Sequence, residues 1–292
     1  GLEIIIMHEH IQQRIQSIIQ NVDQLPSLPD VVSRIINMVN DPNVSFKQVA
    51  EEIAKDQAIT ANILKLCNSA YFSKGKEISS IDRAIVILGL KEVKDIVVLA
   101  TTKSVLNRVI LGYDLARGEL WKHGVAVAML AKKIANDCNQ KTVADIAFTG
   151  GIIHDVGKTV LALFVQSTFK DILSTVTEKN ITFQEAEKLI MGFDHQQIGQ
   201  QVTIKWKFPK VLQSIVRYHH EPTNAPDEHK KIVSIVHIAN TLCLMAGIGI
   251  GSDGLYHELN QDAVTMLGLQ DAQLEKFYSD IPELMNKARD IL

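Results

Sequence analysis

The sequence predicts an all-α protein with two lobes, in which short helices form an N-terminal lobe and a helical bundle follows. Apolar residues recur at spacings of three and four along most of the chain, as at Ile11, Ile15 and Ile18, and this is the spacing of one helix face. No segment shows a convincing strand pattern. With 292 residues, of which 46% are hydrophobic, the chain can bury a substantial core.

A leading helix is expected over residues 1–24, before the segment Leu-Pro-Ser-Leu-Pro at 25–29. Pro26 and Pro29 interrupt the helical pattern, because proline lacks an amide hydrogen and pushes the preceding residue out of helical space. Asp30 then offers a side-chain cap, so the next helix is expected to begin near it.

Residues 25–115 are expected to form four or five short helices, each marked by a start or stop signal. These signals are the capping-box pattern of Ser45 with Gln48, the caps at Asp56 and Ser80, and the helix-ending Gly89. Helices this short are not stable alone, so they must pack on each other or on the bundle that follows.

Residues 116–246 are expected to form the second helical lobe. The predicted helices are 120–136, 144–153, a segment after 158, 183–191, 195–206, 211–219 and 231–246. Four glycines between 247 and 254 predict a flexible break. Two short helices, 262–267 and from 271 onward, complete the region 247–292.

The composition argues against two classes of partner. The net charge of −3, from 33 acidic and 30 basic residues, is spread without long runs, so no nucleic-acid partner is expected. No apolar stretch approaches the roughly 20 residues needed to cross a bilayer, so no membrane association is expected. The three cysteines are odd in number and lie in apolar surroundings, which is typical of reduced thiols and predicts a cytoplasmic location.

Histidine and aspartate residues gather at the ends of several predicted helices. Four segments together carry six candidate metal ligands, namely His123, His154, Asp155, His195, His219 and His220. Imidazole and carboxylate are suitable donors for divalent metals. Gly150 and Gly151 precede the His-Asp pair and would let another helix approach closely. Lys158 follows three positions beyond Asp155, where it can hold a phosphate or pair with that carboxylate.

Any one of these histidines alone is better interpreted as a core residue that hydrogen-bonds a carbonyl or carboxylate, or as a solvated helix end. Taken together, their repeated placement beside small residues favours a cluster that binds metal or once did. The remaining histidines lack a partner motif and are expected to be solvated at the surface: His8, His10, His229, His237 and His257.

The order of His123, the His154-Asp155 pair and a later helix with Asn240 resembles the HD superfamily of metal-dependent phosphohydrolases. That superfamily has an aspartate at the distal position, so the neutral amide of Asn240 is expected to weaken metal retention. The positions of His195 and His219-His220 are similar to the extra ligands of the HD-GYP branch, the cyclic di-GMP phosphodiesterases. Lys158 resembles the lysine of that branch, but residues 221–226 lack its Gly-Tyr-Pro loop.

A broader resemblance covers about residues 22–225. The motifs that carry it are Leu-Pro-Ser-Leu-Pro at 25–29, Asn-Ser-Ala-Tyr-Phe at 68–72, Leu-Trp-Lys-His at 120–123 and Gly-Phe-Asp-His at 192–195. Together they resemble the HD-related output domain, HDOD. This resemblance implies an all-helical bacterial signalling module that is often non-catalytic, with an HD-like second lobe.

Two functions therefore compete. In the first, the chain is a signal-transduction output module that binds signalling proteins, with a degenerate metal site and Lys158 as a structural partner. In the second, it is a phosphohydrolase or cyclic-dinucleotide phosphodiesterase, where Asp155 bridges two metals and Lys158 steadies the phosphoryl oxygens. One metal would take His123, His154, Asp155 and Asn240, and the other Asp155, His195, His219 and His220. The donor set suits one or two ions of iron, manganese, nickel or zinc.

Overall fold

The computed structural model describes residues 13, 15, 17 and 18, and residues 28–292 except 74, 250 and 252–257. Within these residues the regular elements are helices, and an isolated bridge between Ile110 and Leu115 is the one β-type pairing. The all-α prediction is confirmed. Of the expected leading helix, the four described positions are helical. His8, His10, His257 and much of the glycine break lie outside the described residues.

Five helices make up the N-terminal part of the described chain: α2 (Asp30–Val39), α3 (Phe46–Ala54), α4 (Gln57–Cys67), α5 (Ile81–Leu88) and α6 (Leu90–Leu106). Ser45 forms the predicted capping box, and Asp56 and Ser80 cap their helices. The helix begins at Asp30 as predicted, but the capping role predicted for Asp30 was wrong, because Pro29 is the N-cap and Asp30 is the first helical residue. There its carboxylate still favours the positive end of the helix dipole.

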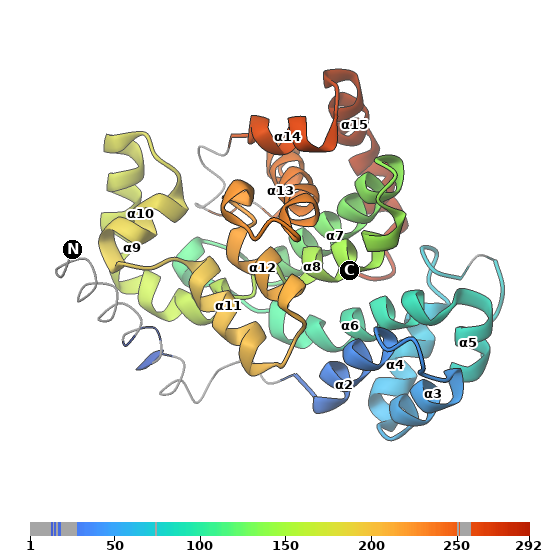
Figure 1. Cartoon of the computed structure of the whole chain (residues 1–292). Coiled ribbons are helices and arrows are strands. Elements are labelled where there is room, and N and C mark those ends of the chain that lie inside the picture. Colours follow the sequence, from blue (N-terminus) through green and yellow to red (C-terminus); the bar gives the residue numbers. More distant parts are fainter. Residues whose placement is uncertain are drawn as a thin grey trace.

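The remaining helices follow the predicted ranges to within about a residue. They are α7 (Glu119–Asp137), α8 (Ala144–Ile153), α9 (Lys158–Lys179), α10 (Phe183–Met191), α11 (His195–Lys205), α12 (Lys210–Tyr218), α13 (Lys230–Met245), α14 (Gln261–Leu267) and α15 (Asp271–Lys287), with short 3-10 turns η1 (Leu111–Tyr113), η2 (Lys141–Val143) and η3 (Pro222–Asn224). In Figure 1, α7 and α8 lie centrally, with α2–α5 to one side and α9–α10 to the other. The domain boundaries expected from the sequence remain predictions.

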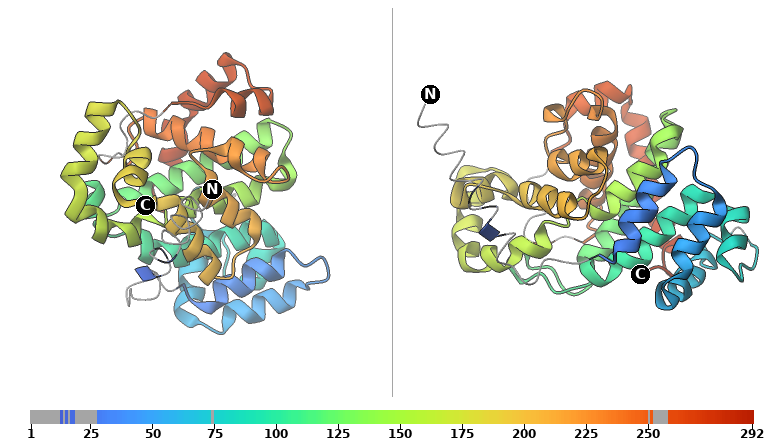
Figure 2. Two further views of the ribbon diagram at one scale, coloured as in Figure 1. Left: turned by 60° about the vertical axis from the view of Figure 1, so that its left-hand side comes forward. Right: turned by 60° about the horizontal axis from the view of Figure 1, so that its bottom comes forward.

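Buried charges join α6 of the N-terminal part to the bundle. Lys94 donates to the carboxylate and the backbone oxygen of Asp145 on α8, at 3.2 and 3.1 Å. Lys132 of α7 donates to Asp95 at 2.9 Å. Both views of Figure 2 keep α2–α5 grouped beside these helices. One cluster of buried hydrophobic residues runs through both parts of the chain, so α8 is held on several sides.

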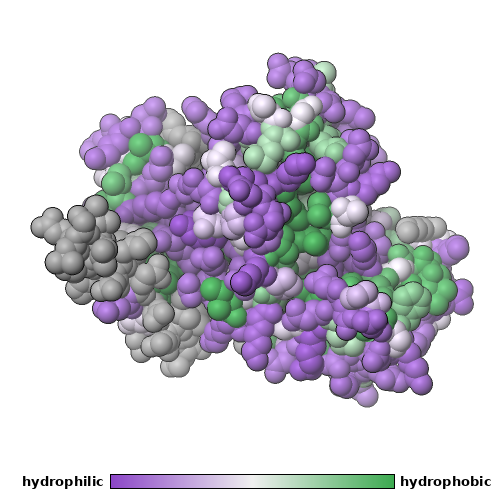
Figure 3. All heavy atoms as spheres, in the orientation of Figure 1, coloured by the Kyte–Doolittle hydropathy of each residue, from purple (hydrophilic) through white to green (hydrophobic). Residues whose placement is uncertain are grey.

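The outer surface is mainly hydrophilic on the face shown in Figure 3, with an apolar patch over α5. Among the described cysteines, Cys67 and Cys243 are buried, Cys138 is half-buried, and all three are free thiols. Burial raises the pKa of Cys67 to about 12. No single described helix is long and apolar enough to cross a membrane, although the pair Lys141–Ala162 and Phe164–Lys179 reaches that length together with a 99° bend.

The two glycines of α8 allow α7 and α12 to approach closely. A Cβ atom on Gly151 would lie 2.6 Å from the Cα of Ala128 on α7. A Cβ atom on Gly150 would lie 2.6 Å from the Cδ1 of Ile215 on α12. Real Cβ atoms essentially never make contacts this short, so the prediction that small residues permit close helix packing is confirmed.

Gly151→Ala is expected to lower the free energy of unfolding by about 3 kcal/mol, because the backbone of α7 cannot move without disturbing the core. Gly150→Ala should cost less, since the terminal methyl of Ile215 can change rotamer. Urea unfolding of both variants followed by circular dichroism compares them directly. Equal losses, or a larger loss for Gly150→Ala, would contradict this account of the helix packing.

Candidate metal centre

The structure brings all six predicted ligands and Asn240 into one buried cluster. His123 lies in the first turns of α7, the His154-Asp155 pair follows α8, and His195 opens α11. The His219-His220 pair follows α12, and Asn240 lies on α13. The ring centroids of His154 and His219 are 4.9 Å apart, and those of His123 and His154 are 5.2 Å apart. Segments from five helices therefore meet at one point.

The carboxylate of Asp155 lies between two sets of imidazoles. Its Oδ1 atom is 3.4 Å from the Nε2 of His219 and 3.5 Å from the Nε2 of His195. Its Oδ2 atom is 3.4 Å from the Nε2 of His154 and 3.9 Å from the Nε2 of His123. The two oxygens of a single carboxylate thus face different histidine pairs.

Each of these four rings is anchored through its Nδ1 atom. His123, His154 and His219 lie 2.8–2.9 Å from the backbone oxygens of Ile248, Gly151 and Val216. A carbonyl oxygen only accepts, so the Nδ1 of each ring carries the proton. The Nε2 lone pairs of His154 and His219 face Asp155, and that of His123 faces the side-chain amide of Asn240. The neighbours of metal-binding histidines commonly fix the tautomer and orientation of the ring in this way.

Three polar atoms at the centre of the cluster are buried without a hydrogen-bond partner among the described residues. They are the Nε2 atoms of His154 and His219 and the Oδ1 atom of Asp155. Leaving such acceptors unsatisfied costs about 1–3 kcal/mol each. A divalent cation would satisfy Oδ1 of Asp155 and Nε2 of His219 together, because imidazole nitrogen and carboxylate oxygen are its usual donors. The residues present therefore fit a metal ion.

Two overlapping groups of residues could hold such an ion. The first contains His123, His154 and Asp155, and the second contains Asp155, His195, His219 and His220. In each group, one donor atom per residue lies within 4.8 Å of the donor atoms of the others. Asp155 belongs to both groups, as expected of a residue placed between two possible ion positions.

Burial controls the charge of these side chains. It lowers the pKa of His219 to about 3 and, reinforced by His154, that of His123 to about 4. For Asp155 burial acts upward, but the Lys158 ammonium and the His154 imidazole outweigh it and hold the pKa well below its usual range. For His195 burial acts downward, yet the carboxylate of Glu187 raises the pKa overall. Neutral His123 and His219 beside an ionised Asp155 are in the protonation states that metal binding needs, whereas His195 must release a proton to bind a metal.

Lys158 pairs with Asp155 rather than extending into solvent. Its Nζ atom lies 2.5 Å from Oδ2 of Asp155 and 5.8 Å from the centre of the Tyr113 ring. Only 4% of Lys158 is exposed. Of the two roles considered for this residue from the sequence, the carboxylate pair is the one that the structure contains.

A second layer of contacts involves residues that sequence reasoning missed. Glu187 of α10 is fully buried and accepts from Nδ1 of His195 at 2.8 Å, from its backbone amide at 3.1 Å, and from the hydroxyl of Tyr113. Glu187 lies in an amphipathic helix beside charged residues, where nothing distinguishes it from a solvated glutamate. The sequence did contain one signal for the histidine that Glu187 contacts. Asp194 and Gln197 form a capping box that fixes the start of α11, where His195 lies.

The glycine-rich segment also contributes to the cluster. Ile248 accepts from His123, and a Cβ atom on Gly249 would lie 2.5 Å from the Cβ of His123. Gly249 has a φ of +62°, a backbone conformation that favours glycine. On the other side of the ring, the side-chain amide of Asn240 lies 2.8 Å from Nε2 of His123. The start of the predicted break is thus part of the wall of the site.

His237 was predicted to be solvated, and this prediction was wrong. It is only 4% exposed, its Nδ1 donates to the backbone oxygen of His219 at 2.7 Å, and the amide of Asn260 donates to its Nε2 at 3.1 Å. The physical reason is that α13 is buried along nearly its whole length. His229 is half-buried and lies 2.9 Å from the hydroxyl of Ser214.

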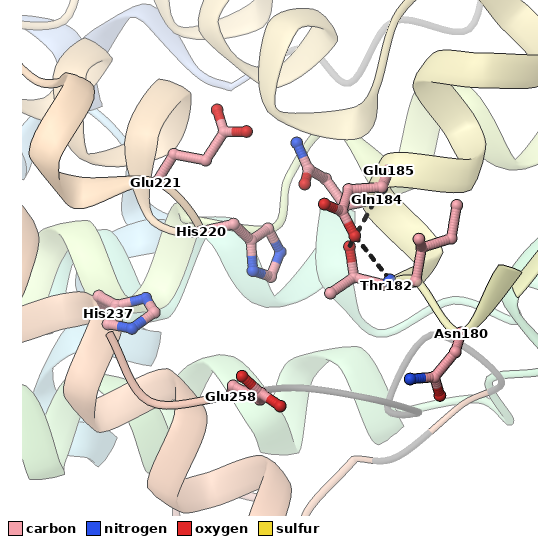
Figure 4. A pocket seen from close by; sticks show the side chains of 9 residues that line it. Asn180, Thr182, Gln184, Glu185, His220, Glu221, His237 and Glu258 are labelled. Carbon is pink, nitrogen blue, oxygen red and sulfur yellow. Dashed lines mark hydrogen bonds between the residues drawn. The ribbon is translucent and has the colours of Figure 1, made fainter. Parts of the chain in front are cut away.

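A cavity of about 520 Å³ reaches the cluster at His220. Figure 4 shows the His220 ring directed into the space between α10, α12 and the segment before α14. The residues that line it are Asn180, Ile181, Thr182, Gln184, Glu185, His220, Glu221, His237 and Glu258. Among the described lining residues there are three carboxylates and neither lysine nor arginine, and Glu221 is paired with Lys188 at 2.9 Å, so Glu185 and Glu258 are the charges that oppose an anionic ligand.

A family model identifies the sequence family, and one relative is similar over most of the chain. The model of the HDOD domain matches residues 25–222. An uncharacterized protein of Treponema pallidum (strain Nichols) is 25% identical over 224 residues, which cover 77% of this chain and 43% of that protein. The chain therefore spans less than half the length of this relative.

Solved structures show the same fold. An HDOD domain protein of unknown function from Geobacter sulfurreducens has a TM-score of 0.72 and 26% identity, covering 94% of this chain and 98% of that chain. A candidate signal transduction protein from Marinobacter aquaeolei VT8 has a TM-score of 0.74 and 20% identity, covering 97% and 66%. A candidate phosphohydrolase from Shewanella amazonensis SB2B has a TM-score of 0.70 and 24% identity, covering 94% and 98%. Since the family model covers most of its length, the chain belongs to the HDOD domain family.

Proposed function

We propose that this protein is a bacterial signal-transduction output module whose HD-type cluster binds a divalent metal to stabilise the fold, without catalysing hydrolysis. Its partners in this proposal are signalling proteins. The Marinobacter protein of the same fold is described as a candidate signal transduction protein. The observation that carries the proposal is the burial of the donor atoms, because Asp155 is 3% exposed and His154 and His219 are fully buried.

Three further features favour a structural metal. Lys158 is paired with Asp155 at 2.5 Å, so its ammonium does not face the cavity as a phosphate-binding group. The lining of the cavity carries the carboxylates of Glu185 and Glu258, which would repel a phosphodiester, and a third carboxylate, Glu221, that is paired with Lys188. The distal position holds the neutral Asn240, which supplies no negative charge to a metal.

The alternative function is a metal-dependent phosphohydrolase or cyclic-dinucleotide phosphodiesterase. One observation favours it: two donor groups share Asp155, and His220 of the second group borders the cavity. A bound metal would supply Lewis acidity there. The Shewanella protein of the same fold is described as a candidate phosphohydrolase.

Elemental analysis combined with activity assays separates the two functions. Protein purified without chelators should contain metal and show no turnover of a generic phosphodiester or of cyclic dinucleotides above that of an Asp155→Ala variant. Turnover in the wild type that disappears in Asp155→Ala would overturn the non-catalytic proposal. The variant controls for contaminating phosphatases, which no substitution in this chain affects.

Metal binding is expected to stabilise the fold measurably. Protein at a free metal concentration of 100 times Kd should unfold with a free energy about 2.7 kcal/mol above that of chelated protein. Urea unfolding with Zn²⁺ or with chelator measures the difference. The His219→Ala variant should show no such difference, because it lacks a donor from the second group. Coincident curves for the wild type under both conditions would contradict a stabilising metal.

A further inference from the structure

We infer that the centre binds one divalent ion on the Oδ1 side of Asp155, and that the ammonium of Lys158 takes the place of a second ion on the Oδ2 side. This inference rests on the proposed metal-binding function and specifies its stoichiometry. It starts from the two oxygens of Asp155, which have different surroundings although they belong to one carboxylate.

The Oδ2 atom already has a cationic partner. Lys158 lies 2.5 Å from it and is almost fully buried, held also against the Tyr113 ring. The Oδ1 atom has no hydrogen-bond partner among the described residues, yet it is buried and faces His195 and His219. A cation is therefore needed at one oxygen and already present at the other.

The imidazoles on the two sides of Asp155 also differ in the charge of the groups that contact them. On the Oδ1 side, His195 is backed by the carboxylate of Glu187, which strengthens its donor nitrogen. On the Oδ2 side, Nε2 of His123 lies 2.8 Å from the side-chain amide of Asn240, which carries no formal charge. The oxygen that lacks a partner thus faces the one imidazole among these four that is backed by a carboxylate, whereas His219, His123 and His154 are backed by backbone carbonyls.

The buried charge also limits the number of ions. Within the centre, the ammonium of Lys158 pairs with the carboxylate of Asp155, and the carboxylate of Glu187 contacts His195. A single divalent ion leaves a small net positive charge in this low-dielectric region, whereas a second would add two more positive charges without another carboxylate. The first ion is therefore favoured and the second is excluded while Lys158 keeps its position.

The test is the number of metal ions bound per chain. Mn²⁺ titration by calorimetry and elemental analysis after desalting should give one ion for the wild type and two for Lys158→Met, which keeps the stem of the side chain and removes the charge. Electron paramagnetic resonance should show an isolated Mn²⁺ ion in the wild type and coupled ions in the variant. A single ion in a folded Lys158→Met protein, or two ions in the wild type, would overturn the inference.

Two alanine variants locate the ion without altering Lys158. His219→Ala should weaken Mn²⁺ binding by about 100-fold or more. His123→Ala should change the affinity by less than about tenfold, which is the smallest effect typical of losing a residue that contacts a metal ligand. The reverse order would overturn the inference. Different results would contradict the two proposals. A wild-type protein that binds no ion contradicts the proposed metal site, whereas a wild-type protein that binds two ions contradicts only the role of Lys158.

Discussion

The Asp155→Asn variant is expected to lose about 3–5 kcal/mol of unfolding free energy, because it leaves the buried ammonium of Lys158 without a counter-charge. In the wild type this ammonium lies 2.5 Å from Oδ2 of Asp155, and both side chains are at least 95% buried. An amide can accept a hydrogen bond from the lysine but does not balance its charge. Urea unfolding in the presence of chelator measures the loss without a contribution from metal.

Two controls separate charge from shape. Asp227 and Lys230 have the same spacing and a 2.7 Å contact, but the Asp227 side chain is 93% exposed, so Asp227→Asn should leave stability within the error of measurement. The double variant Asp155→Asn, Lys158→Met should recover part of the loss, because no charge is then left unpaired. If Asp155→Asn costs no more than Asp227→Asn, the buried pair does not have the role assigned to it.

Acid is expected to destabilise the metal-free protein over the range from pH 7 to pH 5. His219 and His123 have folded-state pKa values of about 3 and about 4, below the ordinary value of 6.5. The unfolded chain therefore takes up protons that the folded chain refuses, and stability is full above pH 6.5 and falls as the pH falls. Each of the two histidines contributes a loss of about 2 kcal/mol at pH 5.

His195 acts in the opposite direction. Glu187 raises its folded-state pKa, so its contribution is present at low pH and is lost as the pH rises through that value. The combined effect of His219 and His123, whose pKa values are lowered, is expected to exceed the effect of His195. Unfolding free energies of chelated wild type and His219→Gln at several pH values test the assignment, and the variant should lose less stability on acidification. Parallel curves for both proteins would show that His219 is not the buried neutral group described.

Much of the fold follows from local signals in the sequence. Ser45, Asp56 and Ser80 cap their helices because a side-chain oxygen beside an apolar run satisfies free amides wherever the helix packs. Gly150 and Gly151 indicated close packing of α8, since glycine in a helix needs a packing reason. The six candidate metal ligands could also be recognised in the sequence, because each lies at a helix end or beside small residues.

The features that the sequence did not reveal depend on contacts between distant segments. Glu187 and Tyr113 are 74 residues apart, and their link to His195 arises only when η1, α10 and α11 pack together. The same holds for Ile248 with His123, 125 residues apart. His237 was misassigned because its neighbours in sequence gave no partner, whereas its partners come from the backbone of His219 and Asn260. Local patterns cannot place such pairs.

Anomalous diffraction from crystals grown with Mn²⁺ tests most directly whether these residues form a metal centre. We expect one anomalous peak, from an ion bound by Oδ1 of Asp155 and the Nε2 atoms of His195 and His219. Lys158 should remain in contact with Oδ2 of Asp155. No peak in the cluster at saturating metal, with the imidazoles in the same positions, would contradict it.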